Sequence, residues 1–120
     1  MISIADITED ITTTLKSVSE VGNRVFPIVA TEGTAYPFIV YERTGTSVRG
    51  TKDGYADLAV TFNVRIVSAT YFDGLQILDK VVAQLERPES LHGIGYNIRL
   101  DGSSEEYTDN CFVQTLTFTI

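Results

Sequence analysis

Apolar residues near the start of the chain recur at intervals of three and four, which is the spacing of one helical face. These residues are Ile4, Ile7, Ile11, Leu15 and Val18. Ser3, with Asp6 three positions later, resembles a capping box in which Asp replaces the usual Glu. Gly22 and Asn23 are residue types that commonly end helices. The pattern therefore predicts an amphipathic helix that runs from the N-terminus to about these two residues.

Three extended segments are predicted after this helix. Residues 25–30, VFPIVA, contain Pro27, which has no N–H to donate, so they form an edge strand or an irregular crossing. Residues 37–43, PFIVYER, are apolar on both faces, as in a strand covered on both sides. Residues 55–68 alternate apolar and polar side chains, which predicts a strand with one face on the core. The Gly- and Thr-rich residues 44–54 are predicted to form a long hairpin loop.

A second helix is predicted to begin at Thr70, which forms another capping-box pattern with Asp73. Its apolar residues again recur at intervals of three and four. They are Leu75, Leu78, Val82 and Leu85. The helix should end near Arg87, because Pro88 cannot continue it.

The last part of the chain has the pattern of a β-hairpin, with a strand at 94–100, an acidic loop at 101–110 and a strand at 111–120. In the final strand one face carries Gln114 together with Phe112, Leu116, Phe118 and Ile120. The order of elements is helix, strand, strand, strand, helix, strand, strand. It predicts one α+β domain over residues 1–120, in which both helices pack on one face of an antiparallel sheet.

Composition says more about the possible partners than about the fold. The 120 residues carry a formal net charge of -7, so we expect no specific binding to nucleic acid, whose phosphates the chain repels. No apolar stretch reaches the roughly 18 residues of a membrane-spanning helix, and the acidic N-terminus lacks the basic start of a signal peptide. Cys111 is the only cysteine, so no intrachain disulfide can form. We expect a protein that is made in the cytoplasm and has no membrane partner.

The chain carries no recognisable motif for catalysis or cofactor binding. Gly45 and Gly50 have the spacing of a phosphate-binding loop, but that loop requires Lys directly after the second Gly and then a helix. Here Thr51 follows, and a strand comes next. The lone histidine, His92, has no nucleophile beside it in the sequence, which favours a structural role. We expect neither enzymatic activity nor a cofactor.

Acidic residues crowd the predicted loop 101–110. They are Asp101, Glu105, Glu106 and Asp109. A calcium loop needs ligands at alternating positions, a central Gly and a closing Glu, and this stretch has none of that spacing. A solvated turn is therefore favoured over a metal site.

The predicted loop 44–54 is a candidate interaction surface. It carries Val48 and two basic residues, Arg49 and Lys52, on an otherwise acidic protein. A basic loop can dock onto the acidic surface of an identical neighbour. It can equally be an exposed hairpin tip without a role, and the sequence does not separate the two.

One longer pattern extends through the first half of the chain. A helix is followed by Gly-x-Arg-hydrophobic-aromatic-Pro, then by a loop, and then by Pro, three hydrophobic residues and Tyr. Its residues include Gly22, Arg24, Val25, Phe26, Pro27, Pro37, Ile39, Val40 and Tyr41. With the later strands and helix, the pattern resembles the tail-completion or tail-terminator-like proteins of tailed phages and prophages. The resemblance covers nearly the whole chain in the order of its elements.

This resemblance implies a structural protein that forms a ring, with six copies expected. The ring would cap the tail tube and join it to the connector on the head side. The partners would be other copies of the chain, the tail tube protein and the head–tail connector proteins. The location would be the virion tail, after assembly in the host bacterial cytoplasm. Contacts to a neighbour or to the tube would involve Val48, Arg49 and Lys52, and secondly Val25, Phe26 and Pro27.

Two alternatives stay open. A head-completion protein would be a different joint of the same particle, and fold-level likeness does not distinguish it from a tail protein. A small ligand-binding or enzymatic α+β domain would have an apolar cavity with converging polar groups between sheet and helices.

Overall fold

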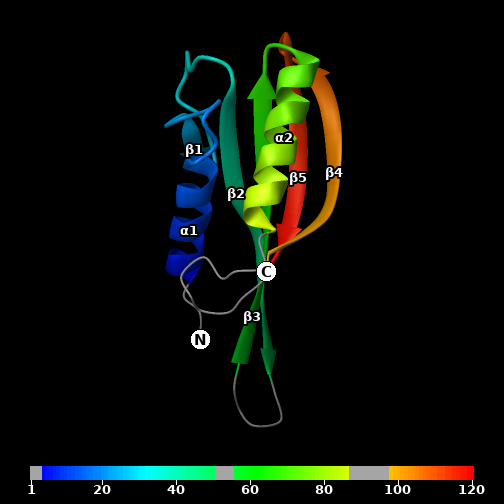
Figure 1. Cartoon of the computed structure of the whole chain (residues 1–120). Coiled ribbons are helices and arrows are strands. Elements are labelled where there is room, and N and C mark those ends of the chain that lie inside the picture. Colours follow the sequence, from blue (N-terminus) through cyan, green and yellow to red (C-terminus); the bar gives the residue numbers. More distant parts are fainter. Residues whose placement is uncertain (1–3, 51–55, 87–97) are drawn as a thin grey trace.

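The computed structural model describes residues 4–50, 56–86 and 98–120, and the side chains of residues 4–46, 60–86 and 98–120. The elements in chain order are α1 (Ile4–Lys16), β1 (Val25–Pro27), β2 (Phe38–Gly50), β3 (Ala56–Ser68), α2 (Tyr71–Leu85), β4 (Arg99–Thr108) and β5 (Cys111–Thr119). Figure 1 shows these two helices and the five-stranded sheet. The predicted α+β class and the predicted order of elements are confirmed.

The strands form one sheet in the order β1-β2-β3-β5-β4. The pairs β2–β3, β3–β5 and β5–β4 are antiparallel, whereas β1 runs parallel to β2. The sheet is therefore mixed and not antiparallel throughout, because residues 28–37 return the chain to the end of the sheet where β1 began. Pro27 lies in β1, at the edge of the sheet, which confirms the edge strand predicted from its missing donor.

Both helices cover the same face of the sheet and share one hydrophobic core (Figure 1). The alternation in β3 directs Phe62, Val64 and Ile66 toward the helices, where all three are buried. The fully buried residues that meet them from the helices and from β5 include Ile7, Leu15, Ile77, Val81, Leu116 and Phe118. This arrangement confirms the prediction that the two helices pack on one face.

Helix α1 ends at Lys16, not at residues 22–23 as predicted. The N–H groups of Ser17 and Val18 bond the carbonyls three residues back, so the last turn tightens and the helix stops. A separate turn follows, in which Gly22 donates to the Val18 carbonyl and adopts a φ of 55°. Gly22 therefore ends this second turn instead of the helix. Ser3, the predicted cap, lies outside the described residues.

Helix α2 begins as predicted, because the Asp73 N–H donates to Thr70 Oγ1 at 3.4 Å. It ends at Leu85, with Glu86 as its C-cap, and Arg87 and Pro88 lie outside the described residues. The centre of the buried face differs from the prediction. The buried residues are Gly74, Ile77, Val81 and Leu85, and Leu78 and Val82 flank them. Gly74 lies against Ser68 at the end of β3, and because it has no side chain it adds nothing to the apolar pattern of the sequence.

The acidic stretch 101–110 is mostly strand, which corrects the predicted loop. Strand β4 continues to Thr108, and only Asp109 and Asn110 form the turn to β5. Their φ angles of 52° and 64° are both positive, as in a type I′ turn between two antiparallel strands. The residues of β4 are exposed except Leu100, which is half-buried, so an edge strand in this position tolerates charges on either face. His92 and residues 94–97 lie outside the described residues.

Candidate assembly surfaces

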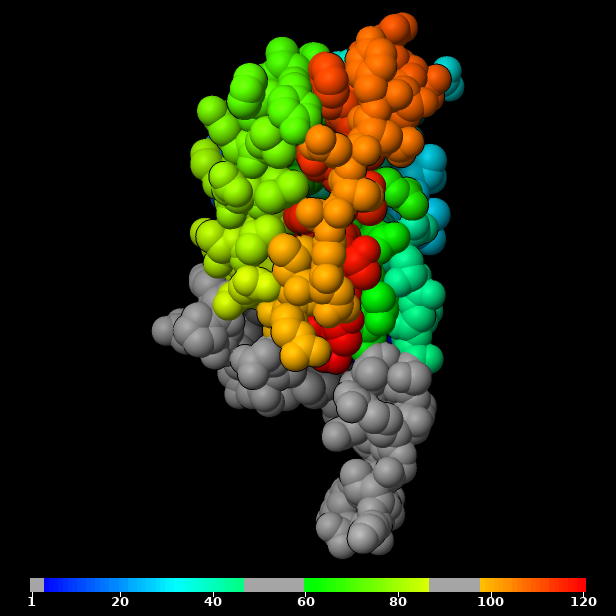
Figure 2. Space-filling view, turned by 90° about the vertical axis from the view of Figure 1, so that its right-hand side faces the viewer, coloured from blue at the N-terminus to red at the C-terminus, as the bar shows by residue number. Residues whose placement is uncertain are grey.

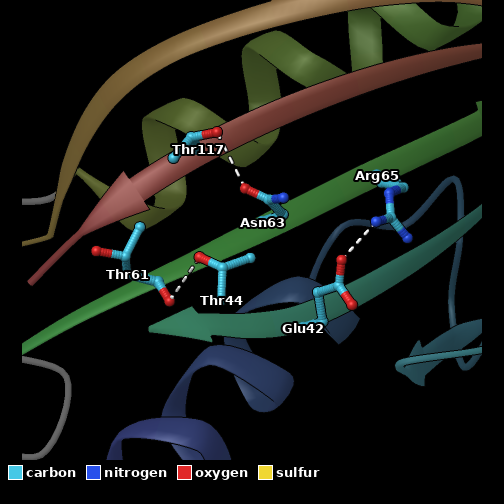
Figure 3. Close-up of polar contacts among 6 residues, drawn as sticks. All are labelled: Glu42, Thr44, Thr61, Asn63, Arg65 and Thr117. Carbon is cyan, nitrogen blue, oxygen red and sulfur yellow. Dashed lines mark hydrogen bonds and ion pairs between the residues drawn. The ribbon is translucent and has the colours of Figure 1, made fainter. Parts of the chain in front are cut away.

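The face of the sheet away from the helices carries polar side chains that pair with one another across the strands (Figure 3). The pairs are Glu42 with Arg65, Asn63 with Thr117, and Thr44 with the backbone carbonyl of Thr61. The Thr117 hydroxyl donates to Asn63 Oδ1 at 3.0 Å. These groups therefore satisfy one another across the middle of the face, while one end of the same face carries an apolar cluster of Val67, Cys111, Val113 and Phe38.

Strands β2 and β3 extend beyond the rest of the sheet as a two-stranded arm. The arm consists of Thr46–Gly50 paired with Ala56–Val60. Strand β5 pairs with β3 from Thr61 onward, and the Ile120 N–H donates to the Val60 carbonyl at 2.9 Å, so the third strand ends at the base of the arm. Five residues of strand span about 17 Å, and Figure 1 shows the arm projecting away from the helices.

The arm corrects the prediction of a loop at 44–54, because residues 44–50 belong to β2. Thr has a high strand propensity, and pairing with the alternating residues of β3 overrides the Gly content. Val48 pairs with Leu58 and Arg49 with Asp57, while the side chains at these positions lie outside the description. Lys52 lies outside the described residues altogether. Of the predicted contact residues, Val48 and Arg49 thus lie on the arm, and Lys52 lies in the sequence between the two strands that form it.

The second predicted contact segment, Val25–Pro27, is strand β1 at one edge of the sheet. Val25 is buried, Phe26 is half-buried and Pro27 is exposed. The exposed apolar surface lies just beyond them, at Ile28 and Val29, whose side chains are 69% and 73% exposed. The segment therefore presents apolar groups to solvent, but mainly from residues that follow the predicted three.

A groove of about 280 Å³ opens beside this segment, between α1 and the outer edge of β2. We call it the edge groove, and its lining includes Ile7, Ile11, Pro27, Ile28, Arg43 and Phe62. Ile28 donates its N–H to the Tyr41 carbonyl at 2.8 Å and has a φ of 66°, so the chain turns away from β2 there. Beyond Tyr41 the β1–β2 ladder ends, which leaves this side of the groove open.

An aromatic patch lies at the other edge of the sheet, and the sequence analysis did not identify it. It consists of Tyr71, Phe72, Tyr107 and Phe112. The Tyr71 ring is 5.6 Å from that of Phe72 and 5.8 Å from that of Phe112, and the Tyr107 ring is 4.9 Å from that of Phe112. Phe72 is 72% exposed and Tyr107 is 62% exposed. Figure 2 shows the start of α2 beside the end of β4, the elements that carry these residues. In the sequence, Tyr71 and Phe72 fall outside the apolar face of α2. Aromatic residues in that position are the signal that could have indicated an exposed patch.

The patch is fixed by a short polar network. The Tyr71 hydroxyl donates to Glu105 Oε2 at 2.9 Å, and Gln114 Nε2 donates to the same oxygen at 3.1 Å. The hydrogen bond to Glu105 raises the pKa of Tyr71, because losing the proton would place two negative charges together. Gln114 is buried on the helix-facing side and orients the Glu105 carboxylate.

Side chains able to bind a metal ion are dispersed in the part of the chain that the structure describes. No three His, Cys, Asp or Glu residues there are placed to hold a metal ion. Cys111 is buried, and its thiol donates to the Thr108 carbonyl at 3.0 Å. Neither of the two described helices has the length and apolar character needed to cross a membrane.

Comparison with known proteins finds a shared fold among solved structures. No protein-family model and no curated protein matches this sequence. A chain from a solved structure described as the virion of a native gene transfer agent (GTA) particle has the same fold, with a TM-score of 0.74. The match covers 99% of this chain and 96% of that chain, at 13% sequence identity. The two chains therefore share a fold over nearly their whole lengths.

Proposed function

We propose that the protein is a structural component of a phage or phage-like particle. The observation that carries this proposal is the fold shared with a chain of a gene transfer agent virion, over 99% of one chain and 96% of the other. A match of that extent includes the arm and both edges, not only a common sheet-and-helix core. The exposed apolar groups at both sheet edges support a role in assembly, since such patches on small proteins mark interaction sites.

Within such a particle, the protein acts as a tail-completion protein. It forms a ring, of six copies, that caps the tail tube and joins it to the head-side connector. A ring needs heterologous contacts, in which two different surfaces of one subunit meet on its neighbours. The chain offers several distinct surfaces for that purpose: the arm, the edge groove and the aromatic patch. Its location is then the virion tail.

The first test is the mass of the assembled protein. Native mass spectrometry and light scattering over a range of concentrations, with and without purified tail tubes, should show a closed ring with six times the mass of the chain. A ring that forms only on tubes also supports the proposal. A chain that stays monomeric under all these conditions and does not bind tubes contradicts it.

The second test concerns the arm. The double substitution R49E/K52E should weaken ring formation or tube binding and leave the monomer folded, because the arm makes no ladder with the rest of the sheet. The variant K16E/R99E is the matched control, since it makes the same change of net charge at exposed residues outside the arm. Equal assembly of both variants would show that the basic residues of the arm make no contact.

A second candidate function rests on the edge groove, whose volume of about 280 Å³ is enough for a small ligand. The groove is lined mainly by apolar residues, and its charged residues are Glu42, which pairs with Arg65, and Arg43. A ligand-binding domain would be stabilised against heat by one member of a metabolite panel.

A head-completion protein would instead be located at the head by labelled electron microscopy of the particle.

A further inference from the structure

The edge groove and the aromatic patch lie on opposite sides of the molecule. The groove borders β1 and β2, and the patch is carried by β4, β5 and the start of α2. Because the sheet order is β1-β2-β3-β5-β4, these are its two edges (Figure 1). Two different surfaces on opposite edges can meet only between different copies, and each such contact leaves one surface of each kind available for a further copy.

The two surfaces match in apolar character. The groove is lined by the aliphatic side chains of Ile7, Ile11 and Ile28, and it has the volume to receive an aromatic ring. On the other edge Phe72 projects with 72% of its side chain exposed. Tyr71 contacts Phe72 edge to face and is itself held by Glu105, so the projecting ring has a fixed support.

The charges around the two surfaces are also complementary. Arg43 is exposed at the groove, while Glu42 beside it is paired with Arg65. The aromatic patch is surrounded by exposed carboxylates. They belong to Asp73, Glu105 and Glu106. On a chain with a net charge of -7, two copies repel unless a cation meets the acidic side, and Arg43 is placed to do so.

The two surfaces lie at different heights along the strands, and the strand pairings give the offset between them. Tyr41 of the groove is in register, through β3 and β5, with Ser103 of β4. By the same pairings Phe38 is level with Glu106, next to Tyr107 of the patch. Along β5 the level of Phe112 lies four residues from that of Tyr41 and six from that of Arg43, which is roughly 13 to 20 Å of strand. Neighbouring copies must therefore be displaced along their strands by about this distance to bring the two surfaces together.

We propose that the aromatic patch of one copy docks into the edge groove of the next, with Phe72 as the apolar anchor and Arg43 facing the carboxylates. This inference rests on the proposed function, and it names the contact that repeats around the ring. Buried aromatic and Arg side chains are the groups that most often dominate interface energies. Replacing Phe72 with Asp should therefore raise the dissociation constant between copies about 30-fold or more.

Cysteine cross-linking tests the contact directly. The variants are V29C, Q76C and the double variant V29C/Q76C, treated with a short bifunctional thiol reagent, and they leave Ile28 and Phe72 in place. Val29 and Gln76 are both exposed, so neither change disturbs the core, and circular dichroism checks the fold of each variant. Wild-type protein is the control for Cys111, which is buried.

The expected result is specific to a head-to-tail contact. On a denaturing gel, the double variant gives a ladder of covalent dimers, trimers and larger species, whereas each single variant runs as a monomer. An equimolar mixture of the two single variants gives dimers and nothing larger, because each copy then has one reactive side. Dimers from Q76C alone would indicate a symmetric contact and overturn the inference.

The outcome also separates this contact from the proposed function. Rings that form in native mass spectrometry without any ladder would show that copies assemble through other surfaces, so the contact is wrong and the proposed function stands. Tube binding by a chain that gives neither rings nor a ladder would place the contact surfaces against another protein. The absence of rings, ladder and tube binding would overturn both.

Discussion

Gly74 shows how one missing side chain sets the position of a helix. It is buried in the first turn of α2, over the end of β3. A Cβ at this position would be 2.7 Å from Ser68 Oγ, closer than non-bonded atoms approach. The Ser68 hydroxyl is itself engaged, because it donates to the Thr70 carbonyl at 2.7 Å. The helix can approach the sheet this closely only because the residue is Gly.

Replacing Gly74 with Ala should therefore destabilise the protein, although Ala is the better helix former by nearly 1 kcal/mol. Overpacking against Ser68 should outweigh this gain and leave a net loss of about 1 to 2 kcal/mol in the free energy of unfolding. Urea unfolding of G74A, S68A and the double variant measures it. S68A removes the clashing oxygen, so the double variant should lose less than the sum of the single variants. Simple additivity would contradict the clash.

At the scale of elements, the β4–β5 hairpin depends on its two-residue turn. Asp109 and Asn110 both have positive φ, a conformation that Asn and Asp tolerate better than other residues with a Cβ. The turn sets the pairing of Thr108 with Cys111 and so the register of the whole edge strand. The position of the aromatic patch follows from this register, because Tyr107 pairs with Phe112.

Replacing Asn110 with Ala should lower the free energy of unfolding by about 1 kcal/mol, because Ala is disfavoured in the left-handed region. Replacing it with Gly should leave stability unchanged or slightly raised, since Asp-Gly is a preferred type I′ pair. Thermal unfolding of the two variants provides the comparison. If both changes destabilised the protein equally, the Asn side chain and not its backbone conformation would be responsible.

At the scale of the whole molecule, the arm makes the protein elongated, with extents of 52 × 24 × 23 Å. The core lies between the helices and the central strands, and the arm extends past it. An unsupported two-stranded ribbon is marginally stable by itself. The proposed function uses the arm as a contact surface, which predicts that folding does not depend on it.

Removing the arm should separate folding from assembly. Thr46 and Val60 are directly paired, so replacing residues 47–59 with Asn-Gly joins them by a two-residue turn. The shortened chain should unfold in urea with a free energy within about 1 kcal/mol of the original, because residues 47–50 and 56–59, the described part of the deleted stretch, form strand pairs only with each other. It should fail to bind tail tubes. Loss of the fold itself would show that the arm supports the core.

The elements with strong periodicity could be predicted, and those defined by a partner could not. The alternation in β3 and the intervals of three and four residues in α1 correctly predicted buried residues such as Val64 and Leu15. Strands β2 and β4 extend further than predicted. Gly, Thr and acidic residues are typical of loops, and only pairing with a neighbouring strand gives them an extended backbone here. The groove and the patch combine residues from distant parts of the chain, so local pattern reading could not assemble them.

The sequence by itself determined the α+β class, the order of elements and the edge position of Pro27, because periodicity and a missing N–H act locally. Only the tertiary structure decided that β1 runs parallel to β2, that β2 and β3 continue into an arm, and that Phe72 and Ile28 are exposed on opposite edges. These features depend on contacts between residues far apart in the chain. Their energies come from pairing and burial that exist only after the sheet has formed.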